Sequence, residues 1–225
     1  MKILALELST ARGSVAWLGQ DESFHEWPND RKNSGPFFEN VAAVQKQFGT
    51  PETIIVGLGP GSYAGIRIAI SAAIGLSVVG GTGSVPSDEK IESVGRHGGR
   101  PSITLIGFPS ICAIECEGNE YCAIGDARRQ SFFFARVRAN DLVEGPNLFT
   151  EAELRSKIGK LEGNMSIFAS EKLPQFERVI VRYPSAKVLA RLAQDSNRSF
   201  SLPPLEPIYL REPHITMPKA HRIAS

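Results

Sequence analysis

The chain opens with three short apolar runs that are separated by turn-forming residues. The segments around Thr10 to Gly13 and Pro28 to Asp30 interrupt the apolar pattern with residues that favour turns. Runs of strand-forming residues between such breaks predict an antiparallel meander. Its strands are expected at Lys2 to Leu8, Ser14 to Leu18 and Glu22 to Trp27.

A longer run follows with a different period. Phe37, Val41, Val44 and Phe48 are spaced 4, 3 and 4 residues apart. This spacing places all four side chains on one face of a helix. We therefore predict a helix from about Gly35 to Phe48 with a single apolar face.

The next segment combines a buried strand, a glycine loop and an unusually apolar helix. The β-branched run from Thr53 to Leu58 predicts a strand that is covered on both sides. After the loop, the predicted helix from Ala64 to Val79 is apolar around most of its circumference, so it needs cover on more than one side. We therefore expect a second protein to pack against it. Residues small enough for close approach are Ala64, Gly65, Ala69, Ala72, Ala73 and Gly75.

The second half repeats the alternation of strands and helices with shorter elements. Thr150-Glu151-Ala152-Glu153 is a capping box, which predicts a helix start because the Thr hydroxyl and the Glu carboxylate can each satisfy a free amide. Other helices are expected at Ser110 to Glu115 and after Pro184, which is followed by Val188, Leu189 and Leu192 on one face. Strands are expected at Ser102 to Ile106, Tyr121 to Asp126, Ser131 to Arg138, Ser166 to Ala169 and Arg178 to Val181. The pattern predicts an α/β protein in which one unit is weakly repeated.

The segment from Val79 to Arg100 interrupts this pattern. Its many glycines favour a loop, with one short helical turn around Glu89 to Val94. We expect an N-terminal lobe at 1–106 that includes an insertion at about 80–100. A C-terminal lobe is expected at 107–202 and a proline-rich tail at 203–225.

Composition narrows the class of protein. The chain has 225 residues, 42% of them hydrophobic, and a formal net charge of +1. These values are ordinary for a globular protein, and the charge does not favour nucleic-acid binding through the chain's own field. The start, Met1 to Glu7, has too short an apolar run for a secretory signal. We therefore expect a cytoplasmic protein.

Cysteines and histidines do not form a recognisable reactive pattern. An odd number of cysteines argues against a disulfide scaffold, and buried reduced thiols are favoured over a metal site. The histidines form no His-x-x-x-His pair, which excludes a helical two-histidine metal site. No Ser-His-Asp or Cys-His arrangement is visible from spacing. The residues concerned are Cys112, Cys116 and Cys122, with His25, His97, His214 and His221.

The glycine loop is the first candidate binding site. A strand, then glycines, then a helix N-terminus is an arrangement that presents free amides to an anion. Its spacing matches neither a P-loop nor a dinucleotide fingerprint. The alternative is a tight connection packed against a neighbouring backbone. For anion or nucleotide binding the candidate residues are Glu7, Gly59, Gly61, Ser62 and Arg67.

Two acidic positions have alternative interpretations. Glu7 ends a strand before a turn, where phosphate-transfer folds often hold a metal; alternatively it hydrogen-bonds the turn at Thr10 to Gly13. Asp126-Ala127-Arg128-Arg129 is either an anion-binding turn or an Asp-capped hairpin with solvated arginines. We assign no catalytic residue and no metal ligand to the chain.

Four segments together resemble the TsaB family, also called YeaZ. Ile3 to Thr10 resembles the family opening ILALDTST, and Gly59 to Ile68 resembles GPGSFTGLRIG. Asp126 to Arg128 matches DAR, and Pro207 to Arg211 matches PxYLR. The matches occur in the family order and span residues 3 to 211.

The resemblance implies a fold, a role and partners. The fold is actin-like (ASKHA), with two related lobes that each have a mixed β-sheet and flanking helices. The role is that of a non-catalytic subunit in making threonylcarbamoyladenosine at tRNA position 37. It would pair with TsaD, the subunit that carries the metal and the transfer site. The assembly would include a TsaE-like ATPase, use ATP and Mg²⁺ within the complex, and contact tRNA indirectly. In isolation the chain is expected to form a homodimer.

The resemblance also implies where the partner binds. In the family, the helices that match Gly35 to Phe48 and Ala64 to Val79 form the dimer face. The residues assigned to this partner interface are Phe37, Val41, Val44, Ala64, Ile68, Ala69, Ala72, Ala73 and Leu76.

Three departures from the family pattern are visible. Glu7 replaces the usual Asp, Asn33-Ser34 replaces a common His-Ser pair, and the stretch at about 80–100 looks inserted. Two other functions are alternatives to this role. A stand-alone ATPase or kinase of the same fold is the main alternative, and a proteolytic enzyme has less support because neither a metal pair nor a nucleophile constellation is visible.

Overall fold

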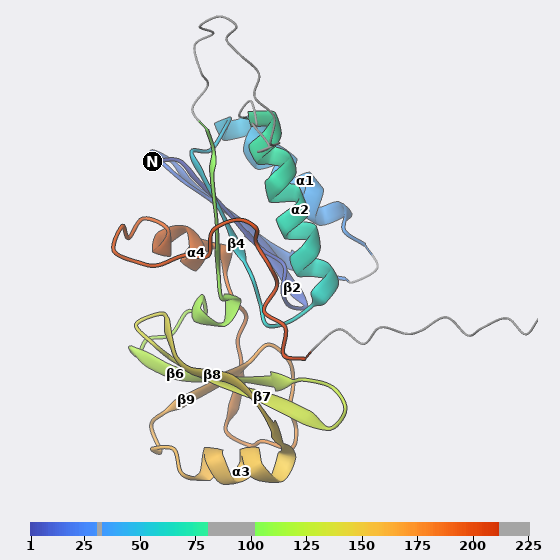
Figure 1. Ribbon diagram of the computed structural model, residues 1–225, viewed down its shortest axis with the longest axis vertical. Helices are drawn as coiled ribbons and strands as arrows, with labels where there is room; N and C mark the ends of the chain where they lie inside the picture. The colour runs from blue at the N-terminus through green and yellow to red at the C-terminus, as the bar shows by residue number, and fades with distance from the viewer. Residues whose placement is uncertain (31–32, 81–101, 212–225) are drawn as a thin grey trace, which may run out of the picture.

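A computed structural model describes residues 1–30, 33–80 and 102–211, which form two lobes (Figure 1). The predicted insertion at about 80–100, its helical turn and the last part of the tail lie almost wholly outside these ranges. In chain order the elements are β1 (Ile3–Glu7), β2 (Arg12–Leu18), β3 (Glu22–Pro28), α1 (Gly35–Phe48), β4 (Thr53–Gly57), α2 (Tyr63–Gly80), β5 (Thr104–Phe108), the 3₁₀ turn η1 (Ser110–Cys112), β6 (Glu120–Asp126), β7 (Ser131–Arg138), β8 (Asp141–Thr150), α3 (Glu151–Gly159), β9 (Ser166–Ala169), β10 (Val179–Val181) and α4 (Ala186–Leu192).

Each lobe contains a five-stranded mixed sheet. The N-terminal sheet has the order β3-β2-β1-β4-β5, and the C-terminal sheet has the order β10-β9-β6-β7-β8. In both, a meander or hairpin supplies antiparallel pairs and the later strands add in parallel. The repeated α/β unit and the two lobes that the sequence predicted are therefore confirmed.

The N-terminal sheet is covered on both faces because its strands are apolar on both. Leu4, Leu6 and Val56 face a core that α1 and α2 close. Ala5 and Ile55 point to the opposite face, which α4 covers. Successive strand residues alternate between faces, so continuous apolar runs such as that in β4 require both layers.

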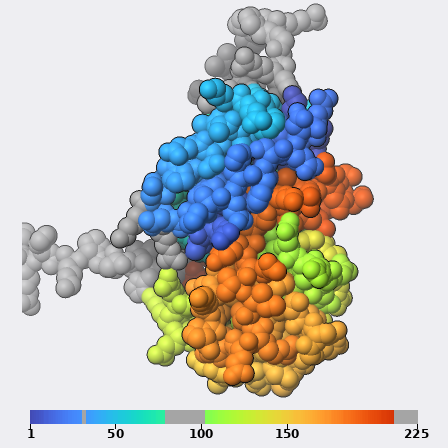
Figure 2. Space-filling model, turned by 180° about the vertical axis from the view of Figure 1, so that it is seen from behind, coloured from blue at the N-terminus to red at the C-terminus, as the bar shows by residue number. Residues whose placement is uncertain are grey.

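Helix α4 covers the N-terminal sheet although it follows the strands of the C-terminal lobe. The Ser14 hydroxyl accepts a hydrogen bond of 2.9 Å from the Ala186 amide, and α4 contacts β1, β2 and β4. Seen from behind, the orange and red segments of the late chain continue from the lower lobe onto the blue lobe (Figure 2). The sequence expectation had placed this stretch, within 107–202, in the C-terminal lobe.

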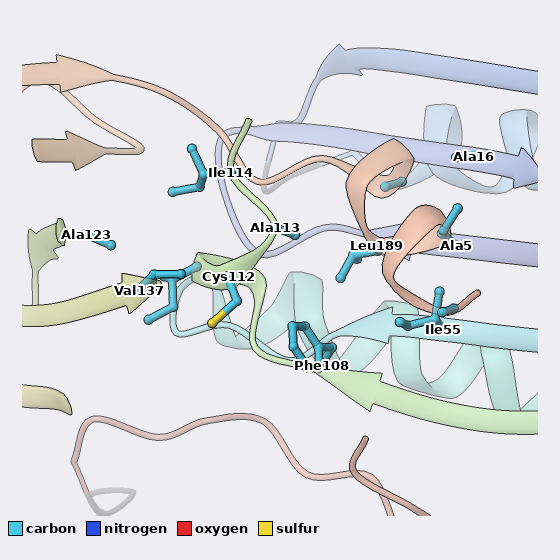
Figure 3. Packing of buried hydrophobic residues seen from close by; sticks show 14 of the residues in the cluster. Ala5, Ala16, Ile55, Phe108, Cys112, Ala113, Ile114, Ala123, Val137 and Leu189 are labelled. Carbon is cyan, nitrogen blue, oxygen red and sulfur yellow. The ribbon is translucent and has the colours of Figure 1, made fainter. Parts of the chain in front are cut away.

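One hydrophobic cluster joins the two lobes. It contains Ala5 and Ile55 from the N-terminal sheet, Leu189 from α4, and Val137 from the C-terminal sheet (Figure 3). We call this cluster the interlobe core. The residues after β5, around Cys112, fill the space between the sheets. A shared core of this kind makes the unfolding of one lobe expose apolar surface of the other.

In the second half, one sequence prediction was wrong and one strand was missed. The helix expected at Ser110 to Glu115 is only the single turn η1, and Ile114 instead pairs with Pro184 in an isolated β-bridge. The strand β8 was not predicted, because Gly145 and Pro146 look like turn residues. They lie in an edge strand beside an irregularity in the β7–β8 ladder, where a missing amide is tolerated.

We predict that Leu189→Ala lowers the free energy of unfolding by about 2–5 kcal/mol, because it leaves a cavity in the interlobe core. Tryptophan fluorescence, which reports only the N-terminal lobe through Trp17 and Trp27, should give the same urea midpoint as far-ultraviolet circular dichroism. Leu202→Ala, at a residue that is 69% exposed, is the control and should change stability by less than about 0.5 kcal/mol. Two separate midpoints would contradict a shared core.

Candidate functional site

The glycine loop between β4 and α2 packs tightly on the turn between β1 and β2. The Ser62 amide donates to the Ser9 carbonyl at 2.6 Å. A Cβ atom on Gly61 would lie 2.1 Å from that same carbonyl oxygen, and one on Gly65 would lie 2.1 Å from the Leu8 carbonyl oxygen. These glycines therefore permit close approach of two backbones. The loop is a tight connection packed against a neighbouring backbone, which was the alternative to an anion site.

Amides of this loop are already engaged within the protein. Besides the Ser62 amide, the Gly59 amide donates to the Ser110 hydroxyl at 2.9 Å. An anion would have to displace these acceptors or use other amides. Gly61 and Ser62 line the cavity described below, whereas Gly59 does not.

Glu7 lies inside the N-terminal lobe rather than at an open site. Its Oε1 accepts a hydrogen bond of 2.7 Å from the Ser9 amide, and the residue is fully buried. Burial raises the pKa of Glu7, and the neighbouring Ser9 and Ser110 only partly oppose this shift. Gly57 is required beside it, because a Cβ there would lie 1.8 Å from Oε2. The carboxyl group is thus a buried hydrogen-bond partner of the chain leaving β1, at Ser9, one residue before the turn at Thr10 to Gly13 that was predicted as an alternative to a metal site.

A cavity of about 390 Å³ lies between the lobes. Its walls come from the β1–β2 turn, the glycine loop, the β6–β7 turn, the residues after β9, and the last described residues of the chain. The residues that line it at these five places are Ser9, Thr10 and Ala11; Pro60, Gly61, Ser62, Tyr63 and Ile66; Asp126, Ala127, Arg128, Arg129 and Phe133; Ser170 and Glu171; and Pro207, Ile208, Tyr209, Leu210 and Arg211.

The β6–β7 turn is held by its own acidic residue. Asp126 Oδ1 accepts a hydrogen bond of 2.7 Å from the Arg128 amide, and Glu171 Oε1 accepts one of 2.9 Å from the Asp126 amide. Arg128, Arg129 and Gln130 all have positive φ values, which orders a left-handed turn. The Asp-capped hairpin is therefore present, and its arginines are exposed at the cavity.

Arg67 points along the surface of α2 instead of into the cavity. Its Nη1 donates to the Tyr63 hydroxyl at 2.8 Å, and its guanidinium lies 5.0 Å from the centre of the Tyr63 ring. Tyr63 itself lines the cavity. The structure thus brings Gly61 and Ser62 to the cleft, and leaves Glu7, Gly59 and Arg67 out of its lining.

The residues assigned to the partner interface divide into two groups. One group is buried in the core of the N-terminal lobe, so its side chains cannot contact a partner in this packing; it comprises Phe37, Val41, Val44, Ala69 and Ala73. The other group retains exposed surface and comprises Ala64, Ile68, Ala72 and Leu76. Periodicity identified the apolar side of each helix, and that side faces the chain's own sheet.

Sequence reasoning left three large, exposed aliphatic or aromatic residues of these helices out of the interface. Phe38 on α1 is 50% exposed, and Ile74 and Val78 on α2 are 47% and 49% exposed. A Cβ on Gly75 would have no neighbour within 4 Å. The available signal was the presence of apolar residues outside the main apolar face, namely Phe38 beside Phe37 and Ile74 and Val78 on α2. We call Phe38, Ile74 and Val78, with Ala64 and Ile68, the helix surface.

The titratable side chains form no metal centre within the described ranges. No group of three His, Cys, Asp or Glu side chains there could hold a metal ion. Burial raises the pKa of Cys112 to about 12 and that of Cys122 to about 11, so both are buried, protonated thiols. Cys116 is partly exposed. No helix among the described residues is long and apolar enough to cross a membrane.

Comparison with solved structures identifies the fold. A structure described as an uncharacterized protein with similarity to peptidase YeaZ from Pseudomonas aeruginosa superposes with a TM-score of 0.67 and 18% identity, covering 93% of this chain and 99% of the other. A second, described as YeaZ from Pseudomonas aeruginosa, gives a TM-score of 0.62 and 18% identity over 86% and 91% of the two chains. No protein-family model and no curated protein matches the sequence. The chain shares the fold of these proteins, and its two mixed sheets with flanking helices confirm the expected two-lobed α/β class.

We predict that the stability of the protein decreases as pH rises above about 4.5 and through the pKa of Glu7, because the folded state binds a proton that the unfolded state releases. Below pH 4.5 this contribution is fully present. Glu7→Gln should remove this pH dependence of stability. The free energy of unfolding of the variant should therefore rise relative to that of the wild type as pH increases. Urea melts from pH 4 to 9 measure this, with Glu22→Gln at an exposed site as the control. Parallel curves for wild type and Glu7→Gln would show that the carboxyl group titrates normally.

We predict opposite effects for two glycines of α2. Gly65→Ala should lower the free energy of unfolding by about 1–3 kcal/mol or more, because its methyl group collides with the Leu8 carbonyl. Gly75→Ala should raise it by up to about 1 kcal/mol, because the site is open and Ala favours the helix. Thermal melts of both variants give the comparison. Equal effects would refute the close approach of the loop to β1.

Proposed function

We propose that this chain belongs to the TsaB/YeaZ family and acts as a non-catalytic scaffold subunit. It would bind and activate a TsaD-like partner in threonylcarbamoyl transfer to adenosine 37 of tRNA. The shared fold and the four sequence segments support the family. The helix surface is the observation that carries the role, because it offers apolar area for a partner next to the family's glycine motif.

The helix surface has the properties of a docking face. Phe38, Ile74 and Val78 each expose about half of their surface. Ala64 and Gly75 are small and exposed on α2, so the backbone of a partner helix could approach closely. Helices α1 and α2 both pack on the same face of the N-terminal sheet. Exposed apolar patches of this kind mark interaction sites more often than single exposed residues do.

The proposed complex distributes the chemistry among its subunits. The TsaD-like subunit would carry the metal and the transfer site, and a TsaE-like ATPase would join the assembly, with ATP and Mg²⁺ bound in the complex. The net charge of +1 gives this chain little field with which to attract RNA, so the partner would supply most of the tRNA contact. Such a complex would act in the cytoplasm. Without its partner, the chain would cover the helix surface by forming a homodimer.

A stand-alone ATPase or kinase is the second candidate, and the interlobe cavity favours it. A cleft between two lobes is a common place for a small ligand. The buried position of Glu7 weighs against it, because this carboxylate does not reach the cavity wall. Nucleotide turnover by the purified chain alone would support the ATPase, and turnover that appears only with a TsaD-like partner would support the scaffold.

We predict that Ile74→Arg weakens binding to a TsaD-like partner by about 100-fold or more, because a charge without a counterion would be buried in the interface. The change leaves the fold intact because Ile74 is exposed. Isothermal titration against the partner measures the effect, with size-exclusion chromatography for the homodimer.

The matched control is Val143→Arg, which introduces the same charge at a residue that is 50% exposed on β8 of the other lobe. It should bind like the wild type. Normal binding by a folded Ile74→Arg variant would exclude the helix surface as the interface. Ala69→Arg, at a residue that the sequence assigned to the interface, is unsuitable as a test. Ala69 is buried in the core of the N-terminal lobe, so the variant would unfold.

A further inference from the structure

The described chain ends in a segment that returns to the cleft between the lobes. After α4, Ser201 forms an antiparallel bridge with Gly107, with hydrogen bonds of 2.9 and 3.0 Å. The chain then runs down the N-terminal lobe and reaches the gap above the C-terminal sheet, as the red trace shows (Figure 1). We call Leu205 to Arg211 the strap.

The strap is attached to the N-terminal lobe at its first half. Leu205 is buried in the core beneath α1 and α2, and Ile208 packs against the same core. The Ile208 amide donates to the Leu58 carbonyl at 2.8 Å, which places the strap beside the glycine loop. The first half of the strap is therefore anchored to the N-terminal lobe.

The second half of the strap reaches across to the C-terminal lobe. Leu210 packs against the interlobe core, and the Tyr209 ring lies 5.6 Å from the ring of Tyr63, centre to centre. Arg211 Nη2 donates to the Arg128 carbonyl in the β6–β7 turn at 3.4 Å. The strap thus bridges the two lobes and supplies one wall of the 390 Å³ cavity through residues 207–211.

The strap is held much more weakly than the walls that it faces. Among contacts between described residues, Ile208 is the one strap residue whose amide donates to a backbone carbonyl. Tyr209 and Arg211 are exposed, and the bond from Arg211 is long. The glycine loop and the β6–β7 turn, by contrast, are continuous with paired strands. Segments with few backbone hydrogen bonds open at a free energy far below that of global unfolding.

We propose that the strap is a reversible gate over the interlobe cavity. It opens locally from Ile208 onward, with Leu205 still anchored, while both lobes stay folded, because the interlobe core holds the lobes together without it. The open state exposes the cavity wall at Ala127, which is buried in the closed state. This device is independent of partner binding at the helix surface.

Hydrogen exchange distinguishes a gate from a permanent wall. The Ile208 amide should exchange faster than the Leu58 amide, which donates to the Phe108 carbonyl at 2.8 Å within the sheet. Its rate should be independent of low urea concentrations and should rise at least about threefold in Tyr209→Ala. Exchange of Ile208 only with the global unfolding of β4 would refute the gate.

Thiol labelling tests access to the cavity directly. Ala127 is 8% exposed on the cavity wall, so Ala127→Cys in a Cys116→Ser background provides a probe with both remaining native thiols buried. A soluble aromatic disulfide should label it at least about five times faster after Tyr209→Ala, or in a chain that ends at Pro207 and so keeps the buried Leu205. A chain that ends at Arg211 and the Leu202→Ala variant are matched controls and should label at the starting rate.

Two results of the labelling experiment would contradict the gate. Equal labelling rates in all folded variants would show that the strap does not cover the cavity, and the gate would be wrong. The same conclusion follows if labelling of the intact chain tracks global unfolding. Ser170→Cys is a second probe on the same cavity, and it should respond to Tyr209→Ala in the same direction if Ala127→Cys perturbs its turn.

Discussion

The packing of α4 on the N-terminal sheet is the contact on which the two-lobed structure depends. Ala5 and Ala16 are register partners on β1 and β2, and both are buried on the face that α4 covers. Small side chains there let a helix with its own buried alanines, Ala186 and Ala190, come close to the sheet. The same cluster continues into the C-terminal sheet, so close-packed side chains join the lobes as one cooperative unit.

The N-terminal lobe carries two separate features, a wall of the interlobe cleft and the exposed outer side of α2. The glycine loop brings α2 close to the β1–β2 turn, and this contact fixes both the start of α2 and one wall of the cleft. The outer side of α2 remains exposed with apolar residues, while its inner side completes the core. Glu7 accepts a hydrogen bond from the Ser9 amide inside the lobe, at the cost of burying a carboxyl group. The candidate site therefore combines an exposed helix surface and a cleft on the same lobe.

Sequence periodicity anticipated most of the elements because local patterns reflect local packing. The helix at Gly35 to Phe48 and the capping box at Thr150 were confirmed, since each depends on residues within one or two turns. The failures occurred where distant contacts override local preference. Ser110 to Cys112 forms one turn because Ser110 bonds the glycine loop, and Asp141 to Thr150 forms a strand because β7 offers it a ladder.

The candidate site shows the same division. The sequence by itself predicted that α2 needs cover on several sides, and it determined that the loop glycines permit close contact and that the β6–β7 turn carries an acidic cap. Only the tertiary structure decided which side of α2 is inward, because an apolar helix has no polar face to orient it. Only the fold buried Glu7, placed α4 on the opposite lobe, and brought the last residues across the cleft, because these contacts join segments that are far apart in the chain.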